Sequence, residues 1–490
     1  MIYGEAIIKW YSSHFQDPLA LNYFNLYLYG GFFEVIAQLA TRIFPFGLFE
    51  TRHLINAAFG LLAIAYAYKC GTQLSSPLGG FLSALFLALT PVFYGHFFNN
   101  PKDLPFASLF LVSLHYLFRV YNALPRFPKK LIVKLGLSIG LTMGIRVGGI
   151  VLLGYLLVFC LAWLVSRYAL KLLPLEALLR EGKSIGMAVL YTLVVTWAVM
   201  LVWWPWALLS PIDNPVRALQ ETAKFQFNVS SFFNGHTYPA SQLPWTYVPV
   251  WLAVSLPEFY FVSLLVGLAF TTIWLSRFQK TPAYLDRAIK LSLLVFAFCF
   301  PIVSSIILRS TNYDGLRHFL FVIPPLALLA GVSLEHLFRT AVSARLKTAI
   351  SVVVAVSLMA TIVDMVQLHP YQSIYFNRII AGGVKGGAAR FETDYGGSSY
   401  KEGAEWVIQN YHQNSPGRTL IANCAVPFLT SYYFNNSEVK DRFITVFQNQ
   451  NPQIFLANTR FDCQNTVKGK VLHVVERKGV PLLYVIQVEE

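Results

Sequence analysis

The chain has 490 residues, of which 56% are hydrophobic and only 13% are charged. A soluble protein carries about a quarter of its residues as charged side chains, so this composition excludes an ordinary water-soluble globular protein. The net charge of +14 does not indicate nucleic-acid binding, because the Lys and Arg residues lie mainly in short loops between apolar runs.

The first 52 residues precede the regular apolar runs. Within the segment 23–46, Glu34, Gln38 and Arg42 recur at a spacing of four. This spacing places the polar side chains on one stripe of a helix. We therefore expect residues 23–46 to form an amphipathic helix in the membrane interface in preference to a membrane span.

Apolar runs long enough to cross a hydrocarbon layer of about 30 Å recur from residue 53 to residue 366. This pattern predicts a mainly α-helical, polytopic membrane domain with about ten spans. The expected spans are 53–74, 77–97, 104–121, 131–147, 149–166, 185–208, 256–275, 289–308, 318–336 and 348–366.

Every second connection between these runs is rich in Lys and Arg, which predicts that these connections lie in the cytoplasm. The basic residues are Arg119, Arg126, Lys129, Lys130 and Lys134; Arg167, Lys171, Arg180 and Lys183; Arg277, Lys280, Arg287 and Lys290; and Arg339, Arg345 and Lys347. The opposite loops concentrate Asp, His, Asn, Trp and Tyr. We therefore expect the functional site on the extracytoplasmic side.

Residues 367–490 predict a small extramembrane α/β domain. Strand-like runs at 419–426, 442–447, 453–458, 470–476 and 481–488 accompany helix-like stretches such as 399–413. The last two runs, separated by Arg-Lys-Gly-Val, predict a hairpin. Cys424 and Cys463 also lie in this domain and could pair in an oxidising compartment, although their spacing alone does not establish a disulfide.

The sharpest polar cluster is GHFFNNPKDLPFA, at residues 95–107, where Asp103 is the only acid. A purely structural interpretation is that Asp103 opens a helix and interacts favourably with its dipole. The polar neighbours favour a functional site, because a membrane-facing turn needs few hydrogen-bonding groups for its structure. These neighbours are His96, Asn99, Asn100 and Lys102.

Two further clusters contain cations at the ends of expected spans. Arg146 lies between two apolar stretches, where an ionised side chain costs ~2.5 kcal/mol or more unless it is paired or hydrated. We interpret it as a phosphate ligand. Asp314, Arg317 and His318 open another span, either as a local Asp–Arg ion pair or as part of the same site.

The long loop at 209–255 contains His236, Tyr238 and Trp245. Such aromatic residues are either membrane anchors or the walls of a groove for a sugar and a lipid. The glycine-rich segment 382–390 matches neither dinucleotide nor P-loop motifs, so we expect a lid or a strap there. No sequence motif with metal-ligand spacing is present, and a divalent-metal requirement is left open.

These blocks resemble the GT-C membrane glycosyltransferases that use polyprenyl-phosphate sugars, near the protein O-mannosyltransferase (family 39) and aminoarabinose transferase branches. The resemblance covers nearly the whole chain, and GHFFNNPKDLPFA and RFETDYGGSSYKEGAEWV carry it most specifically. It implies a GT-C helical core in a bacterial inner membrane, with the active site and the C-terminal domain on the periplasmic side.

In this family, an acid in the first outer loop commonly acts as the base, and an acid in the second helps to place the donor phosphate or the acceptor. Asp103 matches the second acid. The sequence opens with MIYGEAIIKWYSSHFQD, which resembles the middle of the first loop. We therefore expect either a truncated start or that Glu5 or Asp17 takes the role of the first acid.

The predicted function is transfer of a sugar from a polyprenyl-phosphate donor to a lipid, glycan or protein acceptor. Phosphate is a good leaving group, so the reaction needs a carboxylate to take the acceptor proton and cations to hold the phosphate. Asp103 serves in positioning or as the base. Lys102, Arg146, Arg317 and His318 are the expected phosphate ligands, with substrate contacts from His96, Asn99, Asn100, His236, Tyr238, Trp245 and Asp314.

Two other functions are compatible with this sequence. A multispanning transporter would carry ionisable groups near the middle of its spans and two similar halves. A non-catalytic homologue that binds lipid-linked sugars would lack the first-loop acids. The expected domains are 1–52 as the first-loop segment, 53–366 as the transmembrane domain and 367–490 as the C-terminal domain.

Overall fold

The structure is a computed structural model that describes residues 2–223, 229–277, 279, 281–340, 342–411 and 417–489. The chain divides into two compact units. Unit 1 comprises Met1–Gln226, Glu258–Thr311 and Arg317–Leu358, and unit 2 comprises Phe227–Pro257, Asn312–Leu316 and Met359–Glu490. The domain boundaries expected at residues 52 and 366 stay a prediction.

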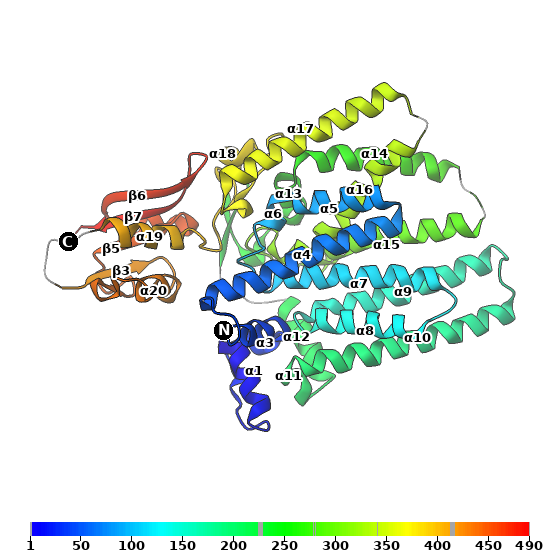
Figure 1. Cartoon of the computed structure of the whole chain (residues 1–490), viewed down its shortest axis with the longest axis horizontal. Helices are drawn as coiled ribbons and strands as arrows, with labels where there is room; N and C mark the ends of the chain where they lie inside the picture. The colour runs from blue at the N-terminus through cyan, green and yellow to red at the C-terminus, as the bar shows by residue number, and fades with distance from the viewer. Residues whose placement is uncertain are drawn as a thin grey trace. The chain divides into compact units, whose positions relative to one another are not determined.

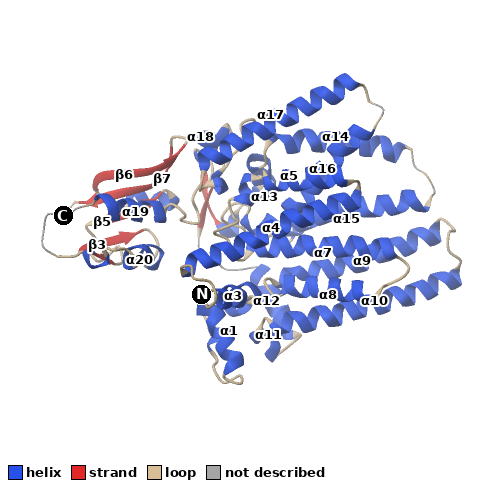
Figure 2. Ribbon diagram, in the orientation of Figure 1, coloured by secondary structure: helices blue, strands red, loops and turns tan. Residues whose placement is uncertain are grey.

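In the described residues of unit 1, all regular secondary structure is helical (Figures 1 and 2). Its first helices are α1 (Ile2–Ser12), α2 (Leu19–Asn22), η1 (Leu26–Leu28), α3 (Phe32–Ala40), α4 (Leu48–Leu74), α5 (Pro77–Ala88), α6 (Pro91–Tyr94), α7 (Asp103–Ala123), α8 (Lys129–Met143), η2 (Val147–Ile150) and α9 (Val151–Ala169). The remaining helices are α10 (Leu175–Val202), α11 (Pro205–Leu209), α12 (Asp213–Ala223), α14 (Glu258–Ser276), α15 (Pro282–Ile307), η4 (Arg317–Val322), α16 (Ile323–Arg339) and the first part of α17 (Ala344–Leu368).

Eight helices in the described part of the chain are long and apolar enough to cross a membrane. They are Leu48–Leu74, Asp103–Ala123, Val147–Ala169, Leu175–Val202, Glu258–Ser276, Pro282–Ile307, Arg317–Arg339 and Ala344–Leu368. The two other expected spans are shorter. The apolar run 77–97 is divided because α5 ends at Ala88 and Pro91 starts α6, and the run 131–147 forms the 15-residue α8, which ends at Met143.

The segment 23–46 does not form a span, because its longest helix, α3, has nine residues. The helix α3 is shorter than the amphipathic helix expected over 23–46, and its position in the membrane interface stays a prediction. Glu34 is buried inside unit 1, whereas Arg42 reaches the surface and pairs with Glu5 of α1 at 2.7 Å. Only the outer part of the expected polar stripe therefore faces solvent.

The connections between the long helices alternate between the two ends of unit 1. The basic connections at 124–128 and 170–174 lie at one end, on the right of Figure 1, and the segments 89–102 and 144–150 lie at the other. Lys280 lies outside the described residues. The charge asymmetry predicted from the sequence therefore corresponds to two different ends of one helical bundle.

Helix α7 is the central helix of unit 1 and is buried over most of its length. It packs against α4, α8 and η4. Close helix packing elsewhere uses small residues, as where Gly136 and Gly140 of α8 lie against Val195 and Thr196 of α10. Burial of α7 fixes the position of Asp103, the first residue of the helix.

Unit 2 contains the strands of the structure, shown in red in Figure 2. Its larger sheet has the order β4-β3-β5-β7-β6. The elements are β1 (Ser230–Phe233), β2 (His236–Pro239), η3 (Ala240–Gln242), α13 (Tyr247–Ser255), η5 (Gln372–Ile374), α18 (Gly383–Ala388), α19 (Tyr400–Asn410), β3 (Thr419–Asn423), α20 (Phe428–Asn435), η6 (Lys440–Arg442), β4 (Phe443–Thr445), β5 (Ile454–Asn458), η7 (Arg460–Asn465), β6 (Gly469–Arg477) and β7 (Val480–Val488).

The α/β character of the tail is confirmed. Each of the five strand-like runs forms a strand, and β6 and β7 pair as the expected antiparallel hairpin. Helix α19 matches the expected helix and buries Tyr400, Ala404 and Val407 in a core shared with the sheet. Residues 412 and 413 of that expected helix lie outside the described residues.

The glycine-rich segment contains the short helix α18. Asn377, just before it, donates to the carbonyl oxygens of Ala253 (2.6 Å) and Leu256 (2.9 Å) and accepts the N–H of Ile380 at 2.9 Å. A single buried amide side chain thus joins the segment to the end of α13. This arrangement fits a strap within unit 2.

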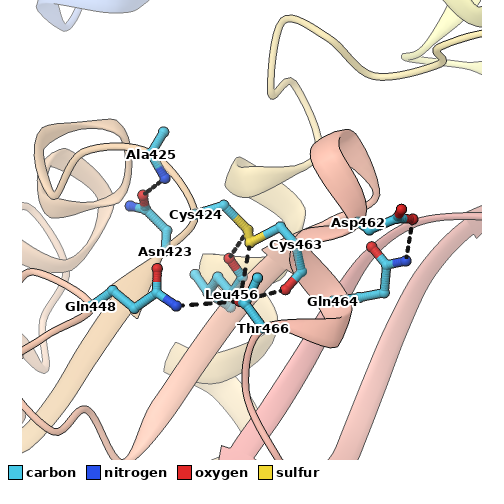
Figure 3. The surroundings of a disulfide bond; sticks show 9 residues. All are labelled: Asn423, Cys424, Ala425, Gln448, Leu456, Asp462, Cys463, Gln464 and Thr466. Atoms are coloured by element: carbon cyan, nitrogen blue, oxygen red, sulfur yellow. Dashed lines mark hydrogen bonds between the residues drawn. A yellow bond between two sulfur atoms is a disulfide. The ribbon is translucent and has the colours of Figure 1, made fainter. Parts of the chain in front are cut away.

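A disulfide joins Cys424, just after β3, to Cys463 in η7, with 6.0 Å between the Cα atoms (Figure 3). It closes a loop across the parallel strands β3 and β5. The other three cysteines, Cys70, Cys160 and Cys299, are free thiols in helices of unit 1.

Thiol counting tests the disulfide. Because two of the five cysteines are paired, we expect a maleimide to label three thiols in the denatured, unreduced protein and five after reduction. The variant Cys424→Ser should show four thiols without reductant and a lower melting temperature, since loss of such a crosslink costs about 2–5 kcal/mol. Five reactive thiols before reduction would contradict the assignment.

Candidate active site

The candidate site is built around an ion pair between Asp103 and Arg146. Asp103 opens α7, and Arg146 lies in an extended connection between α8 and η2. The Asp103 side chain is 7% exposed and that of Arg146 is 24% exposed. A charge pair that is this shielded from water is held firmly, because separating it would leave a buried charge without compensation.

Asn100 holds Asp103 from the preceding turn. Its Oδ1 accepts the backbone N–H of Asp103 at 2.9 Å, and its Nδ2 donates to Asp103 Oδ2 at 3.0 Å. The turn itself is fixed by Asn56 of α4, whose Nδ2 donates to the carbonyl oxygens of His96 (3.0 Å) and Phe97 (2.9 Å). The carboxylate therefore has one oxygen on Arg146 and the other on Asn100.

His96 is buried in the same turn and lies 3.4 Å from Asn100, measured between His96 Nδ1 and Asn100 Nδ2. Asn99, which is exposed, forms a side-chain hydrogen bond with His96. Burial first, and then Arg317, lowers the pKa of His96 to about 4, against the opposing effect of Asp103. His96 is therefore neutral at physiological pH and serves as a hydrogen-bonding group.

Lys102 and Arg146 share an aromatic platform. The Lys102 Nζ lies 4.0 Å from the centroid of the Tyr29 ring, and the Arg146 Cζ lies 5.8 Å from the same centroid. Gly30 makes this contact possible, because a Cβ there would lie 2.2 Å from the Gly144 carbonyl oxygen. Stacking of cations on the ring fixes both charges near each other.

The pKa of Lys102 falls to about 8, chiefly because burial disfavours its charge and secondly because Arg146 repels it. Glu34 and Asp103 oppose this shift. An anion bound next to Lys102 would stabilise the ammonium form and raise this pKa again.

Arg317 and His318 open η4, which packs against α7. Phe321 of the same helix lies 5.2 Å from Phe106 of α7, measured between ring centroids. Arg317 Nε donates to His318 Nε2 at 3.3 Å, and both residues interact electrostatically with Asp103. Unit 1 therefore brings together the predicted site residues from 96–103, 146 and 317–318.

A second buried ion pair joins Glu34 of α3 to Arg52 of α4 at 2.7 Å. Burial by itself would raise the pKa of Glu34, but the charge and hydrogen bond of Arg52 lower it below its ordinary value, with a contribution from Lys102. Glu34, Tyr29 and Lys102 line one small pocket with Tyr3, Leu26, Gly30, Phe33, Pro101 and Ile145. Neither Glu34 nor Tyr29 was predicted as a site residue, although an acid inside an apolar segment was a usable signal.

Arg146 has an unused donor. Its Nε is buried and has no hydrogen-bond partner among the residues described, while its Nη2 is engaged by Asp103. A buried donor without an acceptor is costly, so the arrangement favours an additional acceptor at this point.

Glu5 and Asp17, the candidate first-loop acids, form their hydrogen bonds with residues other than those around Asp103 and Arg146. Glu5 accepts hydrogen bonds from Gln38 at 3.3 Å and Arg42 at 2.7 Å on the surface of α1 and α3. Asp17 accepts the N–H of Leu19 at 3.0 Å in a turn. Their assignment as a base stays a prediction.

The other predicted substrate contacts belong to unit 2. His236 and Tyr238 are on β2, with their ring centroids 6.3 Å apart, and Trp245 is 70% exposed. Asp314 is buried and forms an ion pair with Arg460. Asp314 thus has a partner far along the chain, and the local Asp314–Arg317 pair considered from the sequence stays a prediction.

Glu392 forms a second polar cluster in unit 2. Its Oε2 accepts from Ser231 Oγ at 3.2 Å, and its N–H donates to the Phe232 carbonyl at 3.2 Å. Burial, and secondarily Asp314, raises the pKa of Glu392 to about 7 against the opposing charge of Arg460. The neighbouring Asp394 has a structural role, since it accepts the N–H groups of Ser398 and Ser399 at 2.9 Å.

The described residues contain no group of three or more His, Cys, Asp or Glu side chains that could hold a metal ion. Unlike a metal site, the site around Asp103 contains more cationic side chains than carboxylates. It is suited to an anionic ligand.

The described chain is thus a mainly helical membrane protein with a small α/β part. Residues 32–206 match the family described as dolichyl-phosphate-mannose-protein mannosyltransferase. This match confirms the resemblance inferred from the sequence over that segment, which contains Asp103 and Arg146. A search of curated proteins finds no significant match.

Solved structures with a similar chain course include ArnT from Cupriavidus metallidurans bound to undecaprenyl phosphate. This similarity has a TM-score of 0.47 at 14% identity and covers 99% of the present chain and 92% of ArnT. The Archaeoglobus fulgidus oligosaccharyltransferase in its apo form is similar with a TM-score of 0.45 at 12% identity, over 88% of the present chain and 62% of that protein.

The raised pKa of Glu392 predicts a pH-dependent stability. An ordinary glutamate titrates near 4.5, so between pH 4.5 and about 7 the folded protein retains a proton that the unfolded chain releases. The folded state therefore loses stability as the pH rises through this window. Glu392→Gln should raise the melting temperature at pH 8 and change it little at pH 4.5.

The matched control for this measurement is Glu405→Gln, because Glu405 is an exposed acid on α19. It should show no such difference between the two pH values. Equal effects of Glu392→Gln at both pH values would contradict the pKa assignment.

Proposed function

We propose that this protein is a membrane glycosyltransferase that moves a sugar from a polyprenyl-phosphate donor to an acceptor at the end of the helical bundle that carries Asp103. The observation that carries this proposal is the buried ion pair between Asp103 and Arg146, which interacts electrostatically with Lys102. In this pair, Arg146 Nε has no hydrogen-bond acceptor among the described residues. The family match over residues 32–206 supports it.

In this proposal the donor phosphate binds between Arg146 and Lys102. A guanidinium presents several N–H donors in a plane, and the Lys102 ammonium adds a point charge on the same Tyr29 platform. Arg317 and His318 contribute further donors from η4. These groups stabilise the negative charge that gathers on the phosphate as the bond to the sugar breaks.

The reaction needs no general acid. The acceptor oxygen attacks the anomeric carbon, the bond from that carbon to the phosphate oxygen breaks, and the polyprenyl phosphate leaves as an anion. The acceptor proton goes to a carboxylate. Because both oxygens of Asp103 are engaged by Arg146 and Asn100, we assign Asp103 to orienting Arg146 and assign the proton to another acid.

We further propose that this end of the bundle is extracytoplasmic. The opposite end carries the basic connections, as expected for a cytoplasmic surface. The disulfide in unit 2 fits an oxidising compartment such as a bacterial periplasm. The acceptor in this proposal is a lipid, a glycan or a protein.

The first test is sugar transfer from radiolabelled polyprenyl-phosphate donors by the purified protein in proteoliposomes. Arg146→Ala should lower the rate by about 100-fold or more, and Asp103→Asn by about 10- to 100-fold, because the guanidinium loses its orientation. Arg146→Lys should recover only part of the rate, since an ammonium cannot form two parallel hydrogen bonds.

Arg217→Ala is the matched control, because Arg217 also pairs with an acid, Glu221, but on the exposed surface of α12. It should retain full transfer. Wild-type rates in Asp103→Asn and Arg146→Ala, with unchanged elution and melting temperature, would refute the proposed site.

A second test asks which acid takes the proton. Glu5→Gln, Asp17→Asn and Glu34→Gln can be compared in the same assay across pH 5–9. The base variant should lose transfer at all pH values and recover part of it with a strongly nucleophilic acceptor such as azide. If all three retain the wild-type rate, the base is not among these residues.

A further inference from the structure

A groove separate from the Asp103 cluster lies among α14, α15 and α16 of unit 1. Helices α14 and α15 both pack against α16, which forms the floor of the groove. Gly267 brings α14 close to this floor, because a Cβ there would lie 2.1 Å from Ser333 Oγ. The groove has an empty volume of about 960 Å³, counting its open side.

The interior of the groove is apolar, as expected for a surface that holds a hydrocarbon chain. Its lining includes Leu275, Leu291, Val295, Phe296, Leu329 and Val332. The groove runs along α15 from Arg287 to Cys299. At about 1.5 Å per residue this is roughly 18 Å, close to the thickness of one leaflet of a bilayer.

One end of the groove is polar and basic. There, Arg287, Ser333 and His336 join Thr271 and Trp274 in a continuous recess. Trp274 stacks on Tyr284 with ring centroids 4.1 Å apart, and Tyr284 donates to the Trp274 carbonyl at 3.2 Å, so α14 and α15 are bridged at this end. This is the end of unit 1 that carries the basic connections.

Arg287 has no carboxylate partner among the residues that the structure describes. The neighbouring acids are engaged elsewhere, Asp286 with Arg167 at 2.7 Å and Glu335 with Arg339. Arg287 lies within electrostatic range of His336, whose imidazole N–H can donate a hydrogen bond to an anion held by the guanidinium. A basic recess above an apolar groove between membrane helices has the composition of an anionic lipid site.

We infer that this groove binds one anionic phospholipid, with its phosphate at Arg287 and an acyl chain between α14 and α15. The occupant is a lipid of the leaflet at the basic end, because the groove spans about one leaflet and Arg287, the charged residue of its described lining, is at that end. The inference concerns the end of unit 1 opposite to Asp103 and does not depend on the proposed sugar transfer.

Native mass spectrometry of the whole protein in a mild detergent tests this inference. Titration with dioleoyl phosphatidylglycerol should give a saturable one-lipid adduct with at least fivefold higher affinity than dioleoyl phosphatidylcholine. Arg287→Ala should weaken the phosphatidylglycerol adduct about fivefold, and Arg287→Lys should restore most of it. Ser292→Trp, which fills the groove, should weaken both lipids.

The matched controls are Arg345→Ala, an exposed arginine on α17, and Leu265→Trp, at an exposed position of α14 outside the groove. Neither should change the adducts. Equal binding of the two phospholipids, or equal losses in Arg287→Ala and Arg345→Ala, would overturn the inference. So would an equally strong adduct with glycerol phosphate, which has no acyl chain, or a stronger adduct with a polyprenyl phosphate.

Discussion

The candidate site depends on the ion pair between Asp103 and Arg146, which closes the end of the central helix α7. A charged side chain among apolar helices is stable only when it is paired or hydrated. In this pair the two charges compensate each other, while Arg146 Nε has no hydrogen-bond acceptor in the described protein. The ion pair with Asp103 that stabilises the charge of Arg146 therefore also fixes the orientation of the Arg146 Nε–H group.

The surrounding structure serves to hold this pair in place. Asn56 fixes the turn that carries His96, and Asn100 fixes the carboxylate. Gly30 and Gly144 let the chain bring Tyr29 beneath Lys102 and Arg146. Several cations are thereby held close together despite their mutual repulsion, and an arriving anion would relieve that repulsion.

Unit 2 uses buried polar groups in a different way. Asp394 anchors the start of α19, and Asn377 joins α18 to the end of α13, so these side chains replace missing backbone hydrogen bonds. Glu392 is distinct, because burial makes its charged form unfavourable and nothing nearby fully compensates for it. Its protonation state thus changes in the physiological pH range.

The amino-acid sequence alone predicts the membrane class, most of the spans and the strands of the tail, because these follow from apolar run length and local periodicity. It also identified Asp103 and Arg146, since each is a charge in an apolar context. Three contacts are seen only in the folded chain: the pairing of these two residues, the pairing of Asp314 with Arg460 and the burial of Glu34 against Arg52. Those partners are separated by 18 to 146 positions along the chain, and no local pattern encodes a contact between them.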